Sequence, residues 1–406
     1  MTKFGLLGKT LKHSFSPQIH KLFGDYQYDL IEIDSQDLEK FVKSGEYSGY
    51  NVTIPYKKEI IKYLDQIDEI AKQIGAVNTV VNINGKLVGY NTDWFGMEHA
   101  LKSAGISLSN KKVLILGSGG TSNTAKFVAS HLGARETLIV SRKGEINYQN
   151  CYKEDDAEVI INTTPVGMFP NNYDCPIDLT RFKGLEGVFD AVYNPDMTFL
   201  TFSANKLGIK NANGLTMLVA QAKMACELFK GKRIDDSLID KAVKTIKSQE
   251  QNVVLIGMAG VGKSTVAKKL SKILNKPLID TDQLIEQREN RKISEIFATD
   301  GEDYFRKVEI EVLKEVGKQN GKIIATGGGI VEREQNHFAL KQNGVIFNLV
   351  RDLEKLDRKN RPLSTDLDAV KKLFERRKEK YLEFADYTVD NNADLQSTID
   401  KILEKL

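Results

Sequence analysis

The chain contains the stretch Gly257-Met258-Ala259-Gly260-Val261-Gly262-Lys263-Ser264-Thr265, which follows an apolar run at residues 253–256. The apolar run predicts a buried strand, and the residues after Ser264 have the spacing of a helix. A strand, a glycine-rich turn and Gly-Lys-Ser at a helix start together form a P-loop, in which backbone N–H groups face phosphate oxygens. A glycine-rich turn with a chance lysine is the weaker explanation, because both flanking elements are present.

The P-loop predicts roles for its own residues and for two nearby carboxylates. Lys263 is expected between the β- and γ-phosphates of ATP, and the Ser264 hydroxyl is expected to ligate Mg²⁺. Residues 277–282 predict a strand that ends in Asp280 and Asp282, with both carboxylates on one face. One carboxylate, which we take as Asp280, can meet Mg²⁺, and the other can meet a hydroxyl nucleophile. The nucleotide-binding residues predicted by the motif are Gly260, Val261, Gly262, Lys263, Ser264 and Thr265.

Length and composition narrow the class of protein. A chain of 406 residues is too long for one ordinary core, so two or three domains are expected. The net charge of +3 gives no support for nucleic-acid binding. The 3 cysteines are widely spaced and odd in number, which favours a reducing compartment over a disulfide framework. We find no signal peptide and no apolar stretch of membrane-spanning length, so a cytoplasmic enzyme is expected.

The first part of the chain carries polar residues beside predicted strand ends. Ser14 and Ser16 precede a proline that can start a helix, and Ser16 can cap that helix. Ser14 is not needed for capping, which suggests a polar ligand. Asn51 and Thr53 face the same side of a strand, and Lys57 follows it on a turn. Three polar groups therefore converge at one strand end, as in a ligand site.

Residues 75–93 predict a hairpin that leads to a carboxylate. A strand carrying Asn78 is followed by the turn signal Asn84-Gly85 and by a return strand. The return strand leads into Asn91-Thr92-Asp93. This run can cap a helix that starts at Trp94, or it can add the Asp93 carboxylate to the cluster of Asn51 and Lys57.

From residue 111 the pattern becomes that of a dinucleotide-binding βαβ unit. An apolar strand at 113–116 is followed by a glycine-rich turn that opens a helix, and a second strand follows at 137–140. Ser122 stands where the third glycine of the usual fingerprint would be. The second strand ends in Ser141-Arg142-Lys143, and a basic tip favours a 2′-phosphate and hence NADP, although it can also be a solvated loop. The turn residues are Gly117, Ser118, Gly119, Gly120 and Thr121.

Later segments add strand ends, a long helix and a polar connector. Strands at 159–162 and 187–190 have polar ends, and a helix from Gly214 carries Gln221, either at the surface or reaching the ligand. Residues 238–251 are predicted to finish a helix and become a charged connector that separates two halves. In the second half, Arg306 has Glu309 three residues on, within ion-pair reach on a helix. Spacing alone places Arg377 on a solvated helix face.

Both halves resemble known enzyme families. Residues 1 to about 245 resemble shikimate dehydrogenase through motifs that occur in the family's order: His13-Ser14-x-Ser16-Pro17, Asn51-Val52-Thr53-x-Pro55-x-Lys57, Gly75-Ala76-Val77-Asn78-Thr79, Gly89-x-Asn91-Thr92-Asp93, Gly117-x-Gly119-Gly120, Asn162-x-Thr164-x-x-Gly167-Met168, Asp190-x-x-Tyr193-x-Pro195 and Met217-Leu218-x-x-Gln221-Ala222. Residues from about 252 to 406 are similar to shikimate kinase through the P-loop and Asp280-x-Asp282, Phe305-Arg306-x-x-Glu309, Gly327-Gly328-Gly329, Arg361-Pro362-Leu363 and Arg377-x-x-x-Tyr381. Ser141 and Trp94 depart from the family pattern, which has asparagine and commonly glycine there.

The first resemblance implies site residues for the dehydrogenase half, with Lys57 and Asp93 as the catalytic pair. The substrate residues implied are Ser14, Ser16, Asn51, Thr53, Lys57, Asn78, Asp93, Tyr193 and Gln221. The NADP residues implied are Gly117, Ser118, Gly119, Gly120, Thr121, Ser141, Arg142, Thr163, Gly214 and Met217.

The second resemblance implies site residues for the kinase half, with Lys263 and Asp282 as catalytic residues. Arg358 and Arg361 would lie at the ATP phosphates, with Arg361 closing over them, and Ser264 and Asp280 would hold Mg²⁺. The residues that would hold shikimate are Asp282, Arg306, Gly328, Gly329 and Arg377.

Together these observations predict an α/β protein with two consecutive activities. NADPH would reduce 3-dehydroshikimate to shikimate, and ATP would phosphorylate its 3-hydroxyl, with small molecules and not nucleic acid or membrane as partners. The alternative is a shikimate or quinate dehydrogenase with a non-catalytic, ATP-sensing C-terminal module. We expect a substrate domain at 1–104 plus 213–245, a Rossmann domain at 105–212 and a P-loop domain of the nucleotide-kinase type at 252–406.

Overall fold

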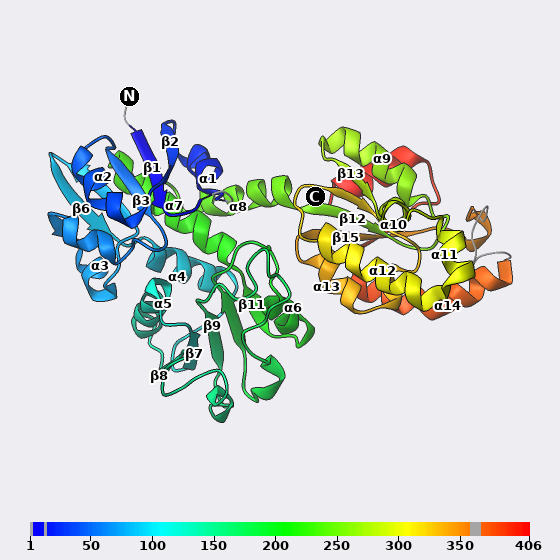
Figure 1. Cartoon of the computed structure of the whole chain (residues 1–406), viewed down its shortest axis with the longest axis horizontal. Helices are drawn as coiled ribbons and strands as arrows, with labels where there is room; N and C mark the ends of the chain where they lie inside the picture. Colours follow the sequence, from blue (N-terminus) through cyan, green and yellow to red (C-terminus); the bar gives the residue numbers. More distant parts are fainter. Residues whose placement is uncertain (1–2, 12–13, 358–366) are drawn as a thin grey trace. The chain divides into compact units, whose positions relative to one another are not determined.

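The computed structural model describes residues 3–11, 14–357 and 367–406. The chain divides into two compact units, Met1–Ile246 and Lys247–Leu406, and each is described by itself (Figure 1). Among the described residues, no helix is both long and apolar enough to cross a membrane.

The first unit begins with a mixed six-stranded sheet. Its strands lie in the order β2 (Gln27–Glu32), β1 (Lys3–Gly8), β3 (Gly49–Val52), β5 (Thr79–Ile83), β6 (Lys86–Tyr90) and β4 (Gln66–Ile67). The predicted hairpin joins β5 to β6, and Asn84 and Gly85 take the positive φ values of 53° and 84° that its tight turn requires. The helices of this part are α1 (Ser16–Phe23), α2 (Leu38–Ser44), α3 (Glu69–Ile74), α4 (Asp93–Ser103) and α7 (Gly214–Lys230).

The second sheet of this unit is fully parallel and has the Rossmann pattern that the sequence predicts. Its strands lie in the order β11 (Lys210–Ala212), β10 (Gly187–Asp190), β9 (Val159–Asn162), β7 (Lys112–Leu116) and β8 (Glu136–Val140). Residues 113–116 of strand β7 are fully buried, because helices such as α5 (Gly120–His131) and α6 (Phe199–Lys206) cover the sheet. The carboxyl ends of β7, β9 and β10 therefore open on one edge, where such sheets bind ligands.

The second unit is a P-loop α/β domain with a parallel sheet. Its strands lie in the order β13 (Leu278–Asp280), β14 (Ile323–Ala325), β12 (Asn252–Ile256), β15 (Gly344–Val350) and β16 (Tyr387–Asp390). Its helices are α9 (Lys263–Leu274), α10 (Thr281–Glu289), α11 (Ile293–Thr299), α12 (Gly301–Val316), α13 (Gln335–Lys341), α14 (Leu367–Phe384) and α15 (Leu395–Leu403). The predicted α/β fold class is confirmed.

The predicted connector differs from the structure. Helix α8 spans Ser237–Glu250, and only Gln251 separates it from β12, so the segment is helical to its end. Its first part buries Ile239, Ala242 and Ile246 at helical spacing. Its last residues are charged and polar. A charged helix end and a coil have similar composition, so the sequence predicted a connector where the structure has the end of a helix.

Candidate active sites

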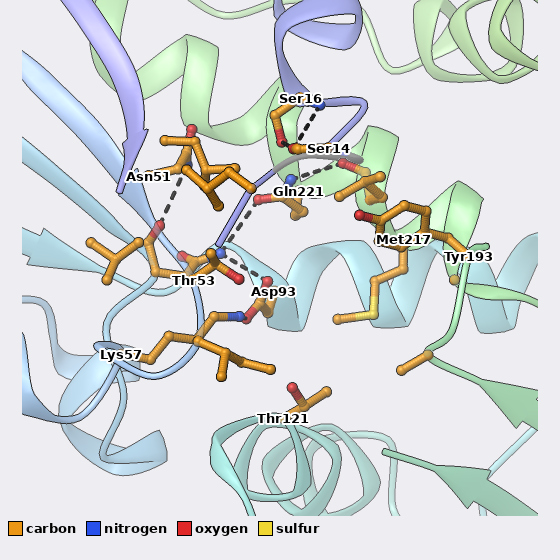
Figure 2. A pocket seen from close by; sticks show the side chains of 18 of the residues that line it. Ser14, Ser16, Asn51, Thr53, Lys57, Asp93, Thr121, Tyr193, Met217 and Gln221 are labelled. Carbon is orange, nitrogen blue, oxygen red and sulfur yellow. Dashed lines mark hydrogen bonds and ion pairs between the residues drawn. The ribbon is translucent and has the colours of Figure 1, made fainter. Parts of the chain in front are cut away.

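A pocket of about 460 Å³ in the first unit gathers the residues that the dehydrogenase resemblance implies (Figure 2). It is lined by the following predicted substrate residues: Ser14, Ser16, Asn51, Thr53, Lys57, Asn78, Asp93, Tyr193 and Gln221. Three predicted cofactor residues, Thr121, Gly214 and Met217, also line it. The pocket thus joins the strand ends of the mixed sheet, helix α7 and the start of α5.

Lys57 and Asp93 form an ion pair inside this pocket. Lys57 Nζ lies 2.6 Å from Asp93 Oδ2, and the two side chains are 16% and 8% exposed. Asn78 Nδ2 donates to the other carboxylate oxygen of Asp93 at 2.8 Å. Because each oxygen of Asp93 has one partner, the lysine amine is kept at a fixed place and can meet a reacting oxygen.

The structure decides between the two interpretations of Asn91-Thr92-Asp93. Helix α4 begins at Asp93 itself, and Asn91 Oδ1 accepts from the Asp93 backbone N–H at 3.0 Å. Asn91 therefore serves the helix start, and the Asp93 carboxylate faces Lys57.

The serine prediction requires a correction. Helix α1 begins at Ser16, whose side chain caps nothing, and the Ser14 hydroxyl accepts from the Ser16 backbone N–H at 3.2 Å. Ser14, not Ser16, therefore supports the helix start. Ser14 Oγ also donates to Ser16 Oγ at 3.1 Å, so both hydroxyls reach the pocket as one group. His13 lies outside the described residues.

Several residues of the pocket network were not singled out from the sequence. Thr79 and Thr92 hydrogen-bond within it, and both belong to the quoted motifs, so their position next to Asn78 and Asp93 was a usable signal. Tyr28, on strand β2, donates a 2.7 Å hydrogen bond to Asn51 Oδ1. Tyr28 belongs to none of the quoted motifs.

The glycine-rich turn after β7 has the shape of a phosphate cradle. Gly117 has a φ of 111°, and a Cβ there would lie 2.8 Å from Thr163 Oγ1. A Cβ added at Gly119 would meet no atom within 4 Å beyond its chain neighbours, and α5 begins at Gly120, so the helix N-terminus borders open space. These residues fit a pyrophosphate. Arg142 is exposed just past the end of β8, as a contact to a 2′-phosphate requires.

The P-loop of the second unit has the expected geometry. Gly262 has a φ of 104°, which a residue with a side chain rarely adopts, and α9 begins at Lys263. Lys263 is buried, and its Nζ donates to the Gly257 carbonyl at 2.7 Å. Ser264 Oγ lies 3.2 Å from Asp280 Oδ2, so a hydroxyl and a carboxylate meet as oxygen ligands that suit Mg²⁺.

The two carboxylates that follow β13 do not share one strand face, contrary to the prediction. Asp280 caps α10, since its side chain accepts from the backbone N–H groups of Asp282 and Gln283. Asp282 lies in the first turn of that helix. Helix α10 begins at Thr281, earlier than the predicted strand would allow. It directs Asp282 toward Gly327, and a Cβ added at Gly327 would lie 2.6 Å from Asp282 Oδ1.

Arg306 is buried between a carboxylate and the glycine loop. Arg306 Nη1 lies 2.9 Å from Glu309 Oε2, and an added Cβ at Gly329 would overlap the guanidinium. Burial raises the pKa of Glu309 to about 7, although Arg306 acts in the opposite direction. Glycine at 329 therefore allows the guanidinium to lie against the loop.

Arg377 is also buried, at 3% exposure, so the solvated face expected from spacing alone is wrong. Its Nε lies 2.7 Å from Glu332 Oε1, and its Nη1 donates to the Gly328 carbonyl at 3.2 Å. Although burial raises the pKa of Glu332, the hydrogen bond and charge of Arg377 lower it to about 2. Arg377 Nη2 is buried without a hydrogen-bond partner among the described residues, which suits an anionic ligand.

Two predicted ATP contacts, Arg358 and Arg361, lie outside the described residues.

Comparisons with known proteins cover both units. Residues 6–80 match the family model of the shikimate dehydrogenase substrate binding domain, and residues 259–406 match that of shikimate kinase. A shikimate dehydrogenase (NADP(+)) of Caldicellulosiruptor bescii is 38% identical over 250 residues, covering 55% of this chain and 87% of the relative.

Two solved structures are similar to the same part. Shikimate dehydrogenase 1 from Peptoclostridium difficile is 36% identical, with a TM-score of 0.57 over 61% of this chain and 98% of that one. Shikimate 5-dehydrogenase from Thermus thermophilus, in complex with NADP(H) and shikimate, is 29% identical, with a TM-score of 0.55 over 60% and 99%. The chain therefore belongs to the shikimate dehydrogenase family, and its second unit is a shikimate kinase domain.

Proposed function

We propose that this chain reduces 3-dehydroshikimate to shikimate with NADPH in its first unit and phosphorylates shikimate with Mg-ATP in its second. The observation that carries the proposal is the Lys57–Asp93 pair, which lies beside the glycine-rich turn. The Lys57 side chain comes within 4.0 Å of the position of a Cβ added at Gly120. The amine can therefore reach a substrate oxygen at the place where the cofactor turn borders the pocket.

In the reductase, NADPH supplies the hydride when bound. Lys57 donates a hydrogen bond to the substrate oxygen and transfers a proton to it, while Asp93 keeps the amine in place. Asn78 in turn fixes Asp93 through its 2.8 Å hydrogen bond. The paired hydroxyls of Ser14 and Ser16 and the amides of Asn51 and Gln221 bind the acid and hydroxyl groups of the substrate, with Thr53 and Tyr193 at the pocket wall.

In the kinase, ATP supplies the γ-phosphoryl group. Lys263 compensates charge on that group, and Ser264 with Asp280 holds Mg²⁺. Asp282 meets the 3-hydroxyl of shikimate. Arg306 and Arg377 bind its carboxylate beside the backbone of Gly328 and Gly329, since both guanidinium groups are buried against that loop.

One incubation tests both proposed activities. The protein is mixed with 3-dehydroshikimate, NADPH and Mg-ATP, and the products are resolved over time. We expect shikimate first and shikimate 3-phosphate after it. A non-catalytic ATP-sensing module would leave unphosphorylated shikimate. In a separate assay with NADP+, a quinate-directed enzyme would oxidise quinate with a higher kcat/KM than shikimate.

The basic tip of β8 predicts a change of cofactor preference. Arg142→Asp should shift the kcat/KM ratio from NADPH toward NADH, because a carboxylate repels the 2′-phosphate and accepts from a free 2′-hydroxyl. The ratio is measured for both cofactors in wild type, Arg142→Asp and the neighbouring variant Lys143→Asp. An unchanged ratio in Arg142→Asp with a shifted ratio in Lys143→Asp would place the 2′-phosphate at Lys143.

We also propose three domains: 1–104 with 213–245, 105–212 and 252–406. Residues 248–251 belong to the second unit and are bonded to the rest of it, because Lys276 Nζ donates to the Ser248 carbonyl at 2.8 Å and Gly321 N donates to the Glu250 carbonyl at 2.7 Å. A fragment that begins at Lys247 should therefore fold and phosphorylate shikimate alone, and residues 1–246 should retain the reductase.

The fragments are expressed separately, and each activity is measured with its own substrate. If both fragments are soluble but inactive while the full chain is active, the sites need residues from both sides of the boundary and the domain proposal is wrong.

A further inference from the structure

The amide of Asn51 lies between two hydroxyl groups in the wall of the reductase pocket. Its Oδ1 accepts from the Tyr28 hydroxyl at 2.7 Å, and its Nδ2 donates to Thr79 Oγ1 at 3.0 Å. An amide can turn by 180° and exchange its oxygen with its nitrogen, and its direction is fixed only by the donors and acceptors around it. What surrounds Asn51 therefore decides which of its atoms a substrate meets.

On the Thr79 side of the amide, the hydrogen bonds begin at Asp93. Its carboxylate only accepts, so Asn78 must present Nδ2 to it, and Asn78 Oδ1 must accept elsewhere. Thr79 donates its single hydroxyl proton to that Oδ1 at 3.1 Å. In this arrangement Thr79 Oγ1 accepts from Asn51, whose oxygen then lies toward Tyr28. Asn78 Oδ1 also accepts from the Thr92 backbone N–H at 2.6 Å, so Thr79 can turn its hydroxyl proton to the amide, and the Tyr28 proton is needed to favour one direction.

Tyr28 is the donor at the other end of this series of hydrogen bonds. Its ring stacks on His20 with centroids 3.9 Å apart. Burial, followed by the nearby Cys226, raises the pKa of Tyr28 well above 10, so the hydroxyl keeps its proton. One N–H of Asn51 Nδ2 is bonded to Thr79, and the other makes only a long contact of 3.4 Å with the Asn78 carbonyl. This second N–H is therefore available to a substrate oxygen.

We propose that Tyr28 is a positioning residue of the reductase, which fixes the Asn51 amide so that its N–H side faces the substrate. The inference rests on the proposed role of Asn51 in substrate binding. Without the Tyr28 proton the amide carbonyl loses its donor, and the turned amide, with its oxygen toward the substrate's own oxygens, becomes populated. The sheet makes this contact possible, since β1 lies between β2 and β3 and pairs Phe4 with Tyr28.

The test uses Tyr28→Phe in the full chain, because phenylalanine keeps the ring on His20 and removes only the hydroxyl. We expect the KM for 3-dehydroshikimate to rise about five- to tenfold, the effect of one neutral hydrogen bond. The kcat should change less than twofold, because the amide binds ground state and transition state alike. The KM for NADPH should not change, which also shows that the unit is folded.

The matched control is Tyr26→Phe. Tyr26 is a neighbour in sequence, and its hydroxyl contacts His20 Nδ1 at 2.7 Å and Cys226, so it reaches the Asn51 amide only indirectly, through His20. This variant should leave the KM for 3-dehydroshikimate unchanged. Thr79→Val removes the acceptor at the other end of the amide and should raise the same KM, which keeps the proposal testable if Tyr28→Phe folds poorly.

A double-mutant cycle separates positioning from general loosening of the fold. Asn51→Ala should raise the KM, and adding Tyr28→Phe should then have no further effect. If Asn51→Ala raises the KM but Tyr28→Phe leaves it unchanged, or if the two effects multiply, the positioning role is wrong while the proposed function stands. If Asn51→Ala leaves the KM unchanged, the proposed role of Asn51 is wrong and the inference falls with it.

Discussion

Replacing Lys57 with alanine should lower the kcat for 3-dehydroshikimate reduction by roughly 10²- to 10⁴-fold, the usual contribution of a positioned acid or base. The lysine is the cationic partner of Asp93 at 2.6 Å in the pocket, and its loss removes the donor proposed to meet the reacting oxygen. The measurement is steady-state oxidation of NADPH at saturating 3-dehydroshikimate. Phosphorylation of shikimate by the same chain should stay at the wild-type rate.

Lys58 provides the matched control for this variant. It is the next residue in the chain, it is exposed, and it does not line the pocket. Lys58→Ala should therefore reduce 3-dehydroshikimate normally. Near-normal turnover by Lys57→Ala would show that another group donates the proton and would remove the catalytic role proposed for the pair.

Replacing Lys263 with alanine should lower shikimate phosphorylation by roughly 10²- to 10³-fold, since it removes a buried positive charge from the phosphate site. The Lys263 amine lies inside the P-loop, where it donates to the carbonyls of Gly257 at 2.7 Å and Met258 at 3.1 Å. The measurement is ADP formation with shikimate and Mg-ATP. Reduction of 3-dehydroshikimate should be unaffected.

Lys268 serves as the control, because it lies on the same helix α9 and is exposed. Lys268→Ala should phosphorylate shikimate at the wild-type rate. If Lys263→Ala retains phosphorylation, the proposed catalytic use of the P-loop is wrong.

Much of the fold could be predicted because its signals are local. The turns at Gly117 and Gly262 require positive φ, and the strands that precede them are short apolar runs. The hairpin at Asn84-Gly85 is likewise specified by its own two residues. Such features depend on neighbours along the chain, so one sequence suffices to find them.

Burial of charged side chains could not be predicted in this way. The helical spacing around Arg377 suggests a solvated face. Arg377 is nevertheless buried, because its Nε donates to Oε1 of Glu332, 45 positions earlier in the chain, at 2.7 Å. The ending of helix α8 raises the same problem, because its charged last turn gains partners such as Asn320 and Gly321 that lie far along the chain. The residue types that flank a position in the sequence do not indicate partners that are distant in the chain.

The sequence by itself therefore determined the fold class, the two glycine-rich turns and the family of each unit, since all of these reside in contiguous motifs. Only the tertiary structure decided that Asp93 faces Lys57, that Asp280 caps a helix before Asp282, and that Tyr28 contacts Asn51. The physical reason is that hydrogen-bond direction and burial depend on which strands become neighbours. The β2–β1–β3 order, which places Tyr28 two strands from Asn51, is a property of the folded sheet.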